Sequence, residues 1–122
     1  MGDEKKSVCI FEDNPTIQVL LKIFFQKRGY LPVITGDGVD AVSVVRRHGP
    51  SLIMLDIIMP GKDGVEACQE LRAAGVTTPI VFLTSKAFAD DKARGLAAGA
   101  DAFLLKPFNP AELDATLRPF LG

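Results

Sequence analysis

The chain contains the run Leu52-Ile53-Met54-Leu55-Asp56, in which four apolar residues lead directly into an acidic one. A continuously apolar run of this length is typical of a strand in a parallel sheet, where both faces are covered. Three similar runs, at residues 8–11, 80–83 and 103–105, lead into Glu12-Asp13, Thr84 and Lys106. Because the carboxyl ends of parallel strands lie along one edge of a sheet, we expect these polar groups to meet in one crevice.

Strands and helices alternate along the rest of the chain. The strand patterns cover residues 7–11, 31–35, 52–55, 80–83 and 101–105, and the helical patterns cover residues 15–28, 37–47, 64–73, 87–98 and 110 onward. Asn14-Pro15 and Asn109-Pro110 are typical helix starts, and Gly29 and Gly99 are typical helix ends. Five strand–helix pairs predict an α/β fold, a doubly wound parallel sheet with helices on both faces.

Apolar spacing also predicts which helix residues face the core. The inward residues are expected to be Val39, Val42 and Val45 in 37–47, Leu96 and Ala97 in 87–98, and Leu113, Leu117 and Leu121 in the last helix. Phe88, near the start of the fourth helix, is expected to pack, with partial exposure as the alternative. Pro119 is expected to fray the end of the last helix.

Size and composition indicate one globular domain over residues 7–121, preceded by a solvated tail over residues 1–6. The net charge of -1 gives no electrostatic case for binding nucleic acid or an anionic membrane. No apolar stretch approaches the roughly 20 residues that span a bilayer, and no signal sequence is evident. We therefore expect a cytoplasmic protein in which Cys9 and Cys68 are reduced core thiols.

The three acids of the expected crevice require a cation. Two like charges 4 Å apart repel by about 4 kcal/mol at an effective dielectric constant of 20, so Glu12, Asp13 and Asp56 would not cluster cheaply alone. Clustered carboxylate oxygens suit Mg²⁺, which binds one or two carboxylates directly and retains several waters.

The same crevice suits a phosphoryl group. A carboxylate such as Asp56 can attack phosphorus and form an acyl phosphate. Charge on the transferring phosphoryl oxygens can be neutralised by the metal, by the ammonium group of Lys106, and by the hydroxyl of Thr84 with backbone N–H groups.

Four motifs together resemble the CheY-like receiver domain of two-component response regulators. They are Glu12-Asp13, the loop 56–64 (Asp56-Ile57-Ile58-Met59-Pro60-Gly61-Lys62-Asp63-Gly64), Thr84-Ser85 and Lys106-Pro107-Phe108. The resemblance covers residues 7–121 and implies a flavodoxin-like (βα)5 fold with strand order 2-1-3-4-5. The second strand ends in no polar residue of this set, which fits a place away from the crevice.

The resemblance also implies a role for each residue of the set. Asp56 would be the phosphoacceptor, Asp13, Asp56 and the carbonyl of Ile58 would ligate Mg²⁺, Glu12 would act through water, and Thr84, Ser85 and Lys106 would hold the phosphoryl group. Thr84 and Phe103 would form the switch pair, in which the aromatic ring moves inward behind the hydroxyl. A cis bond between Lys106 and Pro107 would aim the lysine into the crevice.

Two positions that vary in this family are expected to tune the lifetime of the phosphorylated state. Ile58 and Lys86 would flank the path of the hydrolytic water. Because an isoleucine cannot orient water, we expect slower dephosphorylation than in receivers with a polar residue at the position of Ile58.

The implied function is a phosphorylation-dependent switch that catalyses only its own phosphorylation and dephosphorylation, and so is not a classical enzyme. A sensor histidine kinase or phosphotransfer protein would load Asp56. The surface of the fourth helix, fifth strand and fifth helix would then signal to a downstream output protein or domain. Whether the chain acts alone or was cut from a longer regulator, and whether it dimerises on phosphorylation, is left open by the sequence.

Three alternative functions belong to other classes. A phosphatase of the haloacid-dehalogenase type would need a second acid at position 58, which is Ile58. A flavodoxin-like cofactor binder would need a phosphate loop rich in N–H donors in place of Glu12-Asp13. A receiver with inactive chemistry would retain the fold but bind no phosphoryl mimic.

Overall fold

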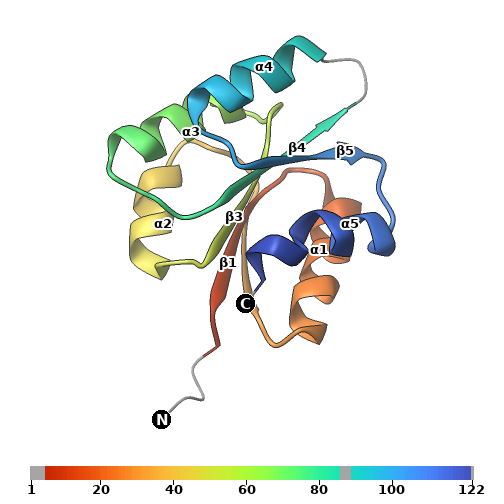
Figure 1. The fold of residues 1–122 in the computed structure, drawn as a ribbon. Helices are drawn as coiled ribbons and strands as arrows, with labels where there is room; N and C mark the ends of the chain where they lie inside the picture. The colour runs from red at the N-terminus through yellow and green to blue at the C-terminus, as the bar shows by residue number, and fades with distance from the viewer. Residues whose placement is uncertain (1–4, 86–88, 122) are drawn as a thin grey trace.

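The computed structural model describes residues 5–85 and 89–121, and within them the strands form a parallel sheet (Figure 1). The strands are β1 (Ser7–Phe11), β2 (Leu31–Thr35), β3 (Leu52–Asp56), β4 (Ile80–Ser85) and β5 (Ala102–Lys106). Their order, β2-β1-β3-β4-β5, confirms the predicted fold.

The helices cover both faces of the sheet. They are α1 (Pro15–Lys27), α2 (Ala41–His48), α3 (Gly64–Ala73), α4 (Ala89–Ala98) and α5 (Pro110–Leu117), and a 3₁₀ turn follows at Arg118–Phe120. Figure 1 shows α2, α3 and α4 on one face and α1 with α5 on the other. Among the described residues, no helix is long and apolar enough to cross a bilayer.

Two apolar clusters, one on each face, fix the sheet between these layers. Alternate residues of each strand point to opposite faces, as the period of a strand requires. Phe11, Ile53 and Phe82 pack with α2 and α3, whereas Met54 and Leu83 pack with α1 and α5. The sheet is thus covered on both faces, which explains why its strands are continuously apolar.

The predicted starts of α1 and α5 are confirmed in detail. The side chain of Asn14 accepts hydrogen bonds from the backbone N–H groups of Thr16 and Ile17. Asn109 and Glu112 form a reciprocal capping box at the start of α5. These caps orient both helices directly after the polar ends of β1 and β5.

The predicted helix over residues 37–47 begins too early, because α2 starts at Ala41. The carboxylate of Asp37 accepts a hydrogen bond from the N–H group of Val39 at 3.0 Å, which forms a turn in place of a helix start. A Cβ atom at Gly38 would lie 2.9 Å from Cε of Met59, so this turn packs tightly on the loop after β3. Val39 is consequently 49% exposed and does not face the core.

The predicted inner face of α4 is also wrong. Leu96 is 53% exposed and Ala97 is exposed, whereas Gly95 and Ala98 are buried. At Gly95 the helix lies so close to the sheet that a Cβ atom would be 2.7 Å from Cζ of Phe103. Phe88, predicted to pack near its start, lies outside the described residues.

The two ends of the chain differ from the predictions in small ways. Lys5 and Lys6 of the predicted tail are exposed, and the rest of the tail lies outside the described residues. The last helix ends at Leu117, so Leu121 lies beyond it, although it is partly buried. Pro119 lies in the 3₁₀ turn that ends the helix, as its lack of an N–H donor favours.

Candidate functional site

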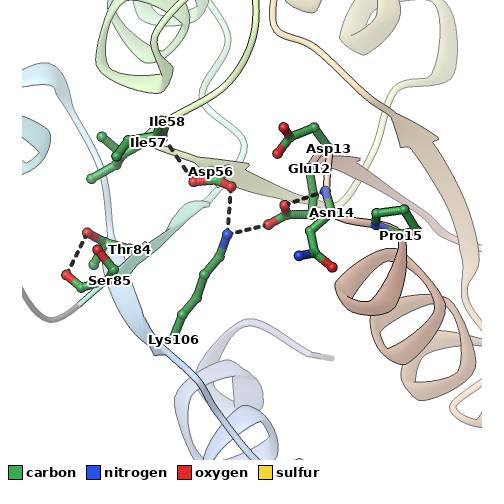
Figure 2. Close-up of a pocket in the computed structure, with 10 residues that line it drawn as sticks. All are labelled: Glu12, Asp13, Asn14, Pro15, Asp56, Ile57, Ile58, Thr84, Ser85 and Lys106. Atoms are coloured by element: carbon green, nitrogen blue, oxygen red, sulfur yellow. Dashed lines mark hydrogen bonds and ion pairs between the residues drawn. The ribbon is translucent and has the colours of Figure 1, made fainter.

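A cavity of about 480 Å³ lies at the carboxyl ends of the strands. It is lined by Glu12, Asp13, Asn14, Pro15, Asp56, Ile57, Ile58, Thr84, Ser85 and Lys106 (Figure 2). The structure therefore brings together seven of the residues predicted for the site. Phe103 does not line the cavity, and Lys86 lies outside the described residues.

The three acids cluster because their strands are neighbours in register. Phe11 of β1 pairs with Leu55 of β3, so Glu12 and Asp56, the next residues along, lie side by side. Glu12, Asp13 and Asp56 each offer a carboxylate oxygen, and these oxygens lie within 4.8 Å of one another. Glu12 and Asp56 are buried and Asp13 is exposed, so the cluster is open to solvent on one side.

Lys106 forms ion pairs with both buried acids. Its Nζ atom lies 2.6 Å from Oδ2 of Asp56 and 2.8 Å from Oε1 of Glu12 (Figure 2). Burial alone would lower the pKa of Lys106, but the hydrogen bonds and charges of Asp56 and Glu12 outweigh it, so this pKa is raised. The ammonium group is therefore held in its charged form between two carboxylates.

Glu12 has the most constrained carboxylate of the site. Burial raises its pKa, against the lowering effects of Lys106 and of the hydrogen bond that its Oε2 accepts from the N–H group of Asn14 at 2.9 Å. Among the described residues, its buried Oε1 has the ion pair with Lys106 but no well-aligned hydrogen bond. Lys106 thus holds one oxygen of Glu12, and the start of α1 holds the other.

Asp56 is oriented by the loop that follows it. Its Oδ1 accepts a hydrogen bond from the N–H group of Ile58 at 3.0 Å. The chain then folds back, and the N–H group of Gly64 donates to the carbonyl oxygen of Ile57 at 2.7 Å. A Cβ atom at Gly64 would lie 2.1 Å from the carbonyl oxygen of Asp56, so only glycine fits at the end of this loop.

Thr84 and Ser85 form the opposite wall of the cavity. Ser85 pairs with Lys106 in the sheet, which places both at the same edge. The hydroxyl of Thr84 is buried and donates a long hydrogen bond of 3.4 Å to the carbonyl oxygen of Ser85. This weak bond leaves the hydroxyl able to rotate toward a better acceptor.

The sequence-based prediction missed two residues of the site. Asn14 was interpreted only as a helix cap, yet its backbone N–H also holds Glu12. Gln18, one turn into α1, donates from Nε2 to the carbonyl oxygen of Glu12 at 2.6 Å. The position of Gln18, shortly after the N-cap and proline, could have predicted this contact. A side chain one turn into a helix can reach back past the N-terminus of that helix.

The predicted Lys106-Pro107 cis peptide bond is present.

The residues fit a magnesium ion. The cluster offers only oxygen ligands, which Mg²⁺ prefers, and an under-satisfied buried oxygen of Glu12 lies beside it. Asp13 and Asp56 are close enough to share one small cation, and the open side of the cluster leaves space for bound waters. Direct ligation by the carbonyl of Ile58 stays a prediction.

Comparisons with known proteins agree on one family. A sequence model described as the response regulator receiver domain matches residues 8–118. The chain is 38% identical over 119 residues to the DNA-binding response regulator MtrA of Mycolicibacterium smegmatis. The aligned region covers 97% of this chain and 51% of MtrA. The chain thus spans about half the length of the curated relatives it matches.

Solved structures show the same likeness. The BeF₃-activated N-terminal receiver domain of RstA from Klebsiella pneumoniae has a TM-score of 0.87 and 35% identity, over 95% of this chain and 98% of that one. The receiver domain of the sensor histidine kinase PA1611 from Pseudomonas aeruginosa has a TM-score of 0.86 and 33% identity, over 98% and 99%. That second structure has a magnesium ion coordinated in its active-site cleft.

Proposed function

The chain belongs to the response regulator receiver domain family, and from this premise we propose that it is a switch operated by phosphorylation of Asp56. The observation that carries the proposal is the cluster of Glu12, Asp13 and Asp56 beside the ammonium group of Lys106. A surface cluster would not bury two acids, whereas a phosphoryl site requires a nucleophilic carboxylate, a cation site and a lysine together.

In the proposed reaction, a carboxylate oxygen of Asp56 attacks the phosphorus atom of a phosphohistidine on a sensor histidine kinase or phosphotransfer protein. The bond from phosphorus to the histidine nitrogen breaks as the bond to the Asp56 oxygen forms, and the imidazole leaves with the electron pair. Asp13, Asp56 and the carbonyl of Ile58 would hold Mg²⁺, with Glu12 acting through water. Bound Mg²⁺ supplies positive charge that offsets the negative charge of the acids and the phosphoryl oxygens.

The chain's own groups then stabilise the product. Lys106, now paired with Oδ2 of Asp56, would exchange that oxygen for a phosphoryl oxygen. The hydroxyl of Thr84 would leave its long bond to the carbonyl oxygen of Ser85 and donate to a second phosphoryl oxygen. The small side chain of Ser85 leaves room for the group at this wall.

We propose that these movements are transmitted to a partner through Phe103. The movement of Thr84 would stabilise the inward position of the Phe103 ring, and the surface of α4, β5 and α5 would change. Phosphorylation would thus shift a pre-existing equilibrium toward the form that binds the phosphoryl group better. The chain would catalyse only its own phosphorylation and dephosphorylation.

The partners follow from the same proposal. The loading partner would be a cytoplasmic sensor kinase or phosphotransfer protein, and the receiving partner an output protein or domain. MtrA, a relative about twice as long, is named a DNA-binding regulator. We propose that any DNA contact belongs to such an output domain and not to this one, whose net charge is -1.

Labelled acetyl phosphate, a small phosphoryl donor, tests the proposed function. We expect the wild type to take up label in the presence of Mg²⁺, and to lose that uptake in EDTA or with Asp56→Asn. Asp40→Asn is the control, since Asp40 is an exposed acid outside the cavity. Equal labelling of Asp56→Asn, or no labelling of the wild type, would refute the proposal and favour a receiver with inactive chemistry.

A further inference from the structure

An aromatic pair lies behind Thr84 on the face of the sheet that α4 covers. Phe82 of β4 and Phe103 of β5 are register partners, and their rings stack with centroids 5.6 Å apart and planes 29° apart. Thr84 follows Phe82 by two residues, so both side chains point to the same face. Movement of the Phe103 ring therefore changes the space beside the Thr84 hydroxyl.

Gly95 of α4 leaves the space that this pair occupies. A Cβ atom at Gly95 would lie 2.7 Å from Cζ of Phe103 and 3.0 Å from Cδ2 of Phe82. The first distance is shorter than real carbon–carbon contacts. Glycine inside a helix is unfavourable relative to alanine, so its presence here needs a packing reason. The ring edge of Phe103 supplies that reason.

The two rings are not equally free to move away from α4. Phe82 is fully buried among residues of β3, α3 and α4, whereas Phe103 is only partly buried. A methyl group at position 95 would therefore displace Phe103 before Phe82. Because of this asymmetry, the size of residue 95 determines where the ring of Phe103, one residue of the predicted switch pair, can lie.

We propose that Gly95 is a positioning residue for the switch, because the absence of its side chain lets the ring of Phe103 lie inward against Phe82. The proposal rests on the proposed function, in which the inward ring accompanies the bond from Thr84 to the phosphoryl group. A side chain at position 95 would destabilise the inward ring and so weaken binding of the phosphoryl group.

Thermal unfolding of Gly95→Ala separates this role from helix propensity. If propensity alone mattered, the substitution would raise the melting temperature. The steric clash predicts that it falls by roughly 5 °C, as overpacked cores do. Ala97→Gly is the matched control, because Ala97 is exposed on the same helix and reports the propensity difference between these residues in α4. A Gly95→Ala protein more stable than the wild type would overturn the proposal.

A double-substitution cycle identifies the contact. Phe103→Leu removes the ring edge, so Gly95→Ala should be tolerated in that background and the two effects should not add. This arm also covers the case in which Gly95→Ala does not fold alone, since the double variant should fold. Equal destabilisation in both backgrounds would show that the ring of Phe103 is not what position 95 controls.

Beryllofluoride with Mg²⁺ tests the link to the switch, since a structural role alone would not change it. We expect Gly95→Ala to bind beryllofluoride about fivefold more weakly than the wild type, measured by titration with ¹⁹F NMR. In the Phe103→Leu background, Gly95→Ala should cause no further loss of affinity for beryllofluoride. Unchanged affinity in Gly95→Ala would overturn the role in the switch.

The two proposals fail in different ways. A wild-type protein that neither takes up label nor binds beryllofluoride would refute the proposed function and, with it, the role of Gly95 in a switch. A wild type that does both, with no coupling between residues 95 and 103, would refute only the inference about Gly95.

Discussion

Lys106 and Asp56 lie 50 positions apart in the chain, yet Nζ of Lys106 is 2.6 Å from Oδ2 of Asp56. The same ammonium group is 2.8 Å from Oε1 of Glu12, which is completely buried. Two acids that repel each other in a poorly solvated site therefore share one cation, which offsets part of their repulsion. Lys106 stabilises the fold in this state, and its predicted role in phosphoryl binding requires it to change partners.

Removing this cation should destabilise the protein. Lys106→Met leaves Glu12 and Asp56 buried without their counterion, and we expect the free energy of unfolding to fall by about 3 kcal/mol. Urea unfolding followed by circular dichroism measures it. Lys62→Met is the control, because the Lys62–Glu70 pair lies at the surface and should contribute less than about 1 kcal/mol. Equal losses in the two variants would contradict the account of the buried site.

Asp13 should be destabilising when no divalent cation is bound. It adds an exposed negative charge to the cluster, so Asp13→Ala should raise the stability by about 0.5–1 kcal/mol at low ionic strength without Mg²⁺. Added Mg²⁺ should stabilise the wild type more than the variant. Melting temperatures with and without Mg²⁺ measure both effects, with Asp40→Ala as the control. A lower or unchanged value for Asp13→Ala without Mg²⁺ would count against repulsion within the cluster.

Ile58 should slow loss of the phosphoryl group. Its side chain lines the cavity and is 60% exposed at the rim, where it would screen Asp56 from water without being able to orient a water molecule. We expect Ile58→Asn to lose label several-fold faster than the wild type in a decay experiment after removal of the donor. Leu31→Asn, at an exposed apolar residue of β2 outside the cavity, should decay like the wild type. Slower or equal decay of Ile58→Asn would disprove the screening role.

The thiol of Cys9 should make the protein less stable in alkaline solution. Burial raises its pKa from 9.0 to about 11. Between these values an unfolded chain loses the thiol proton while the folded chain keeps it, so the free energy of unfolding falls as the pH rises. The effect vanishes well below pH 9 and amounts to at most about 1.4 kcal/mol per pH unit between pH 9.0 and about pH 11.

Urea unfolding between pH 8 and pH 10.5, from about one pH unit below the pKa of the free thiol to about 1.5 units above it, measures this slope. Cys9→Ala should show a shallower decline, whatever its stability at neutral pH, because other groups that titrate are shared by both proteins. Equal slopes would mean that Cys9 is not buried as described.

Local sequence patterns predicted most of the fold. Apolar runs marked each strand, and Asn-Pro pairs marked two helix starts, because these signals depend on residues that are adjacent in the chain. The start of α2 was wrong because the turn at Asp37 and Gly38 depends on packing against Met59, which lies in another loop. The inner face of α4 was wrong for a similar reason: small size at Gly95 outweighed apolar character at Leu96.

The sequence by itself determined which polar side chains end the strands, because strand length and alternation are local properties and parallel strands share one edge. Only the tertiary structure decided the burial and the partner of each side chain: Glu12 is buried and paired with Lys106, whereas Asp13 next to it is exposed to solvent. Register between strands, the approach of α4 to the aromatic pair and the reach of a lysine across two strands arise from packing between distant segments. No local pattern encodes those distances.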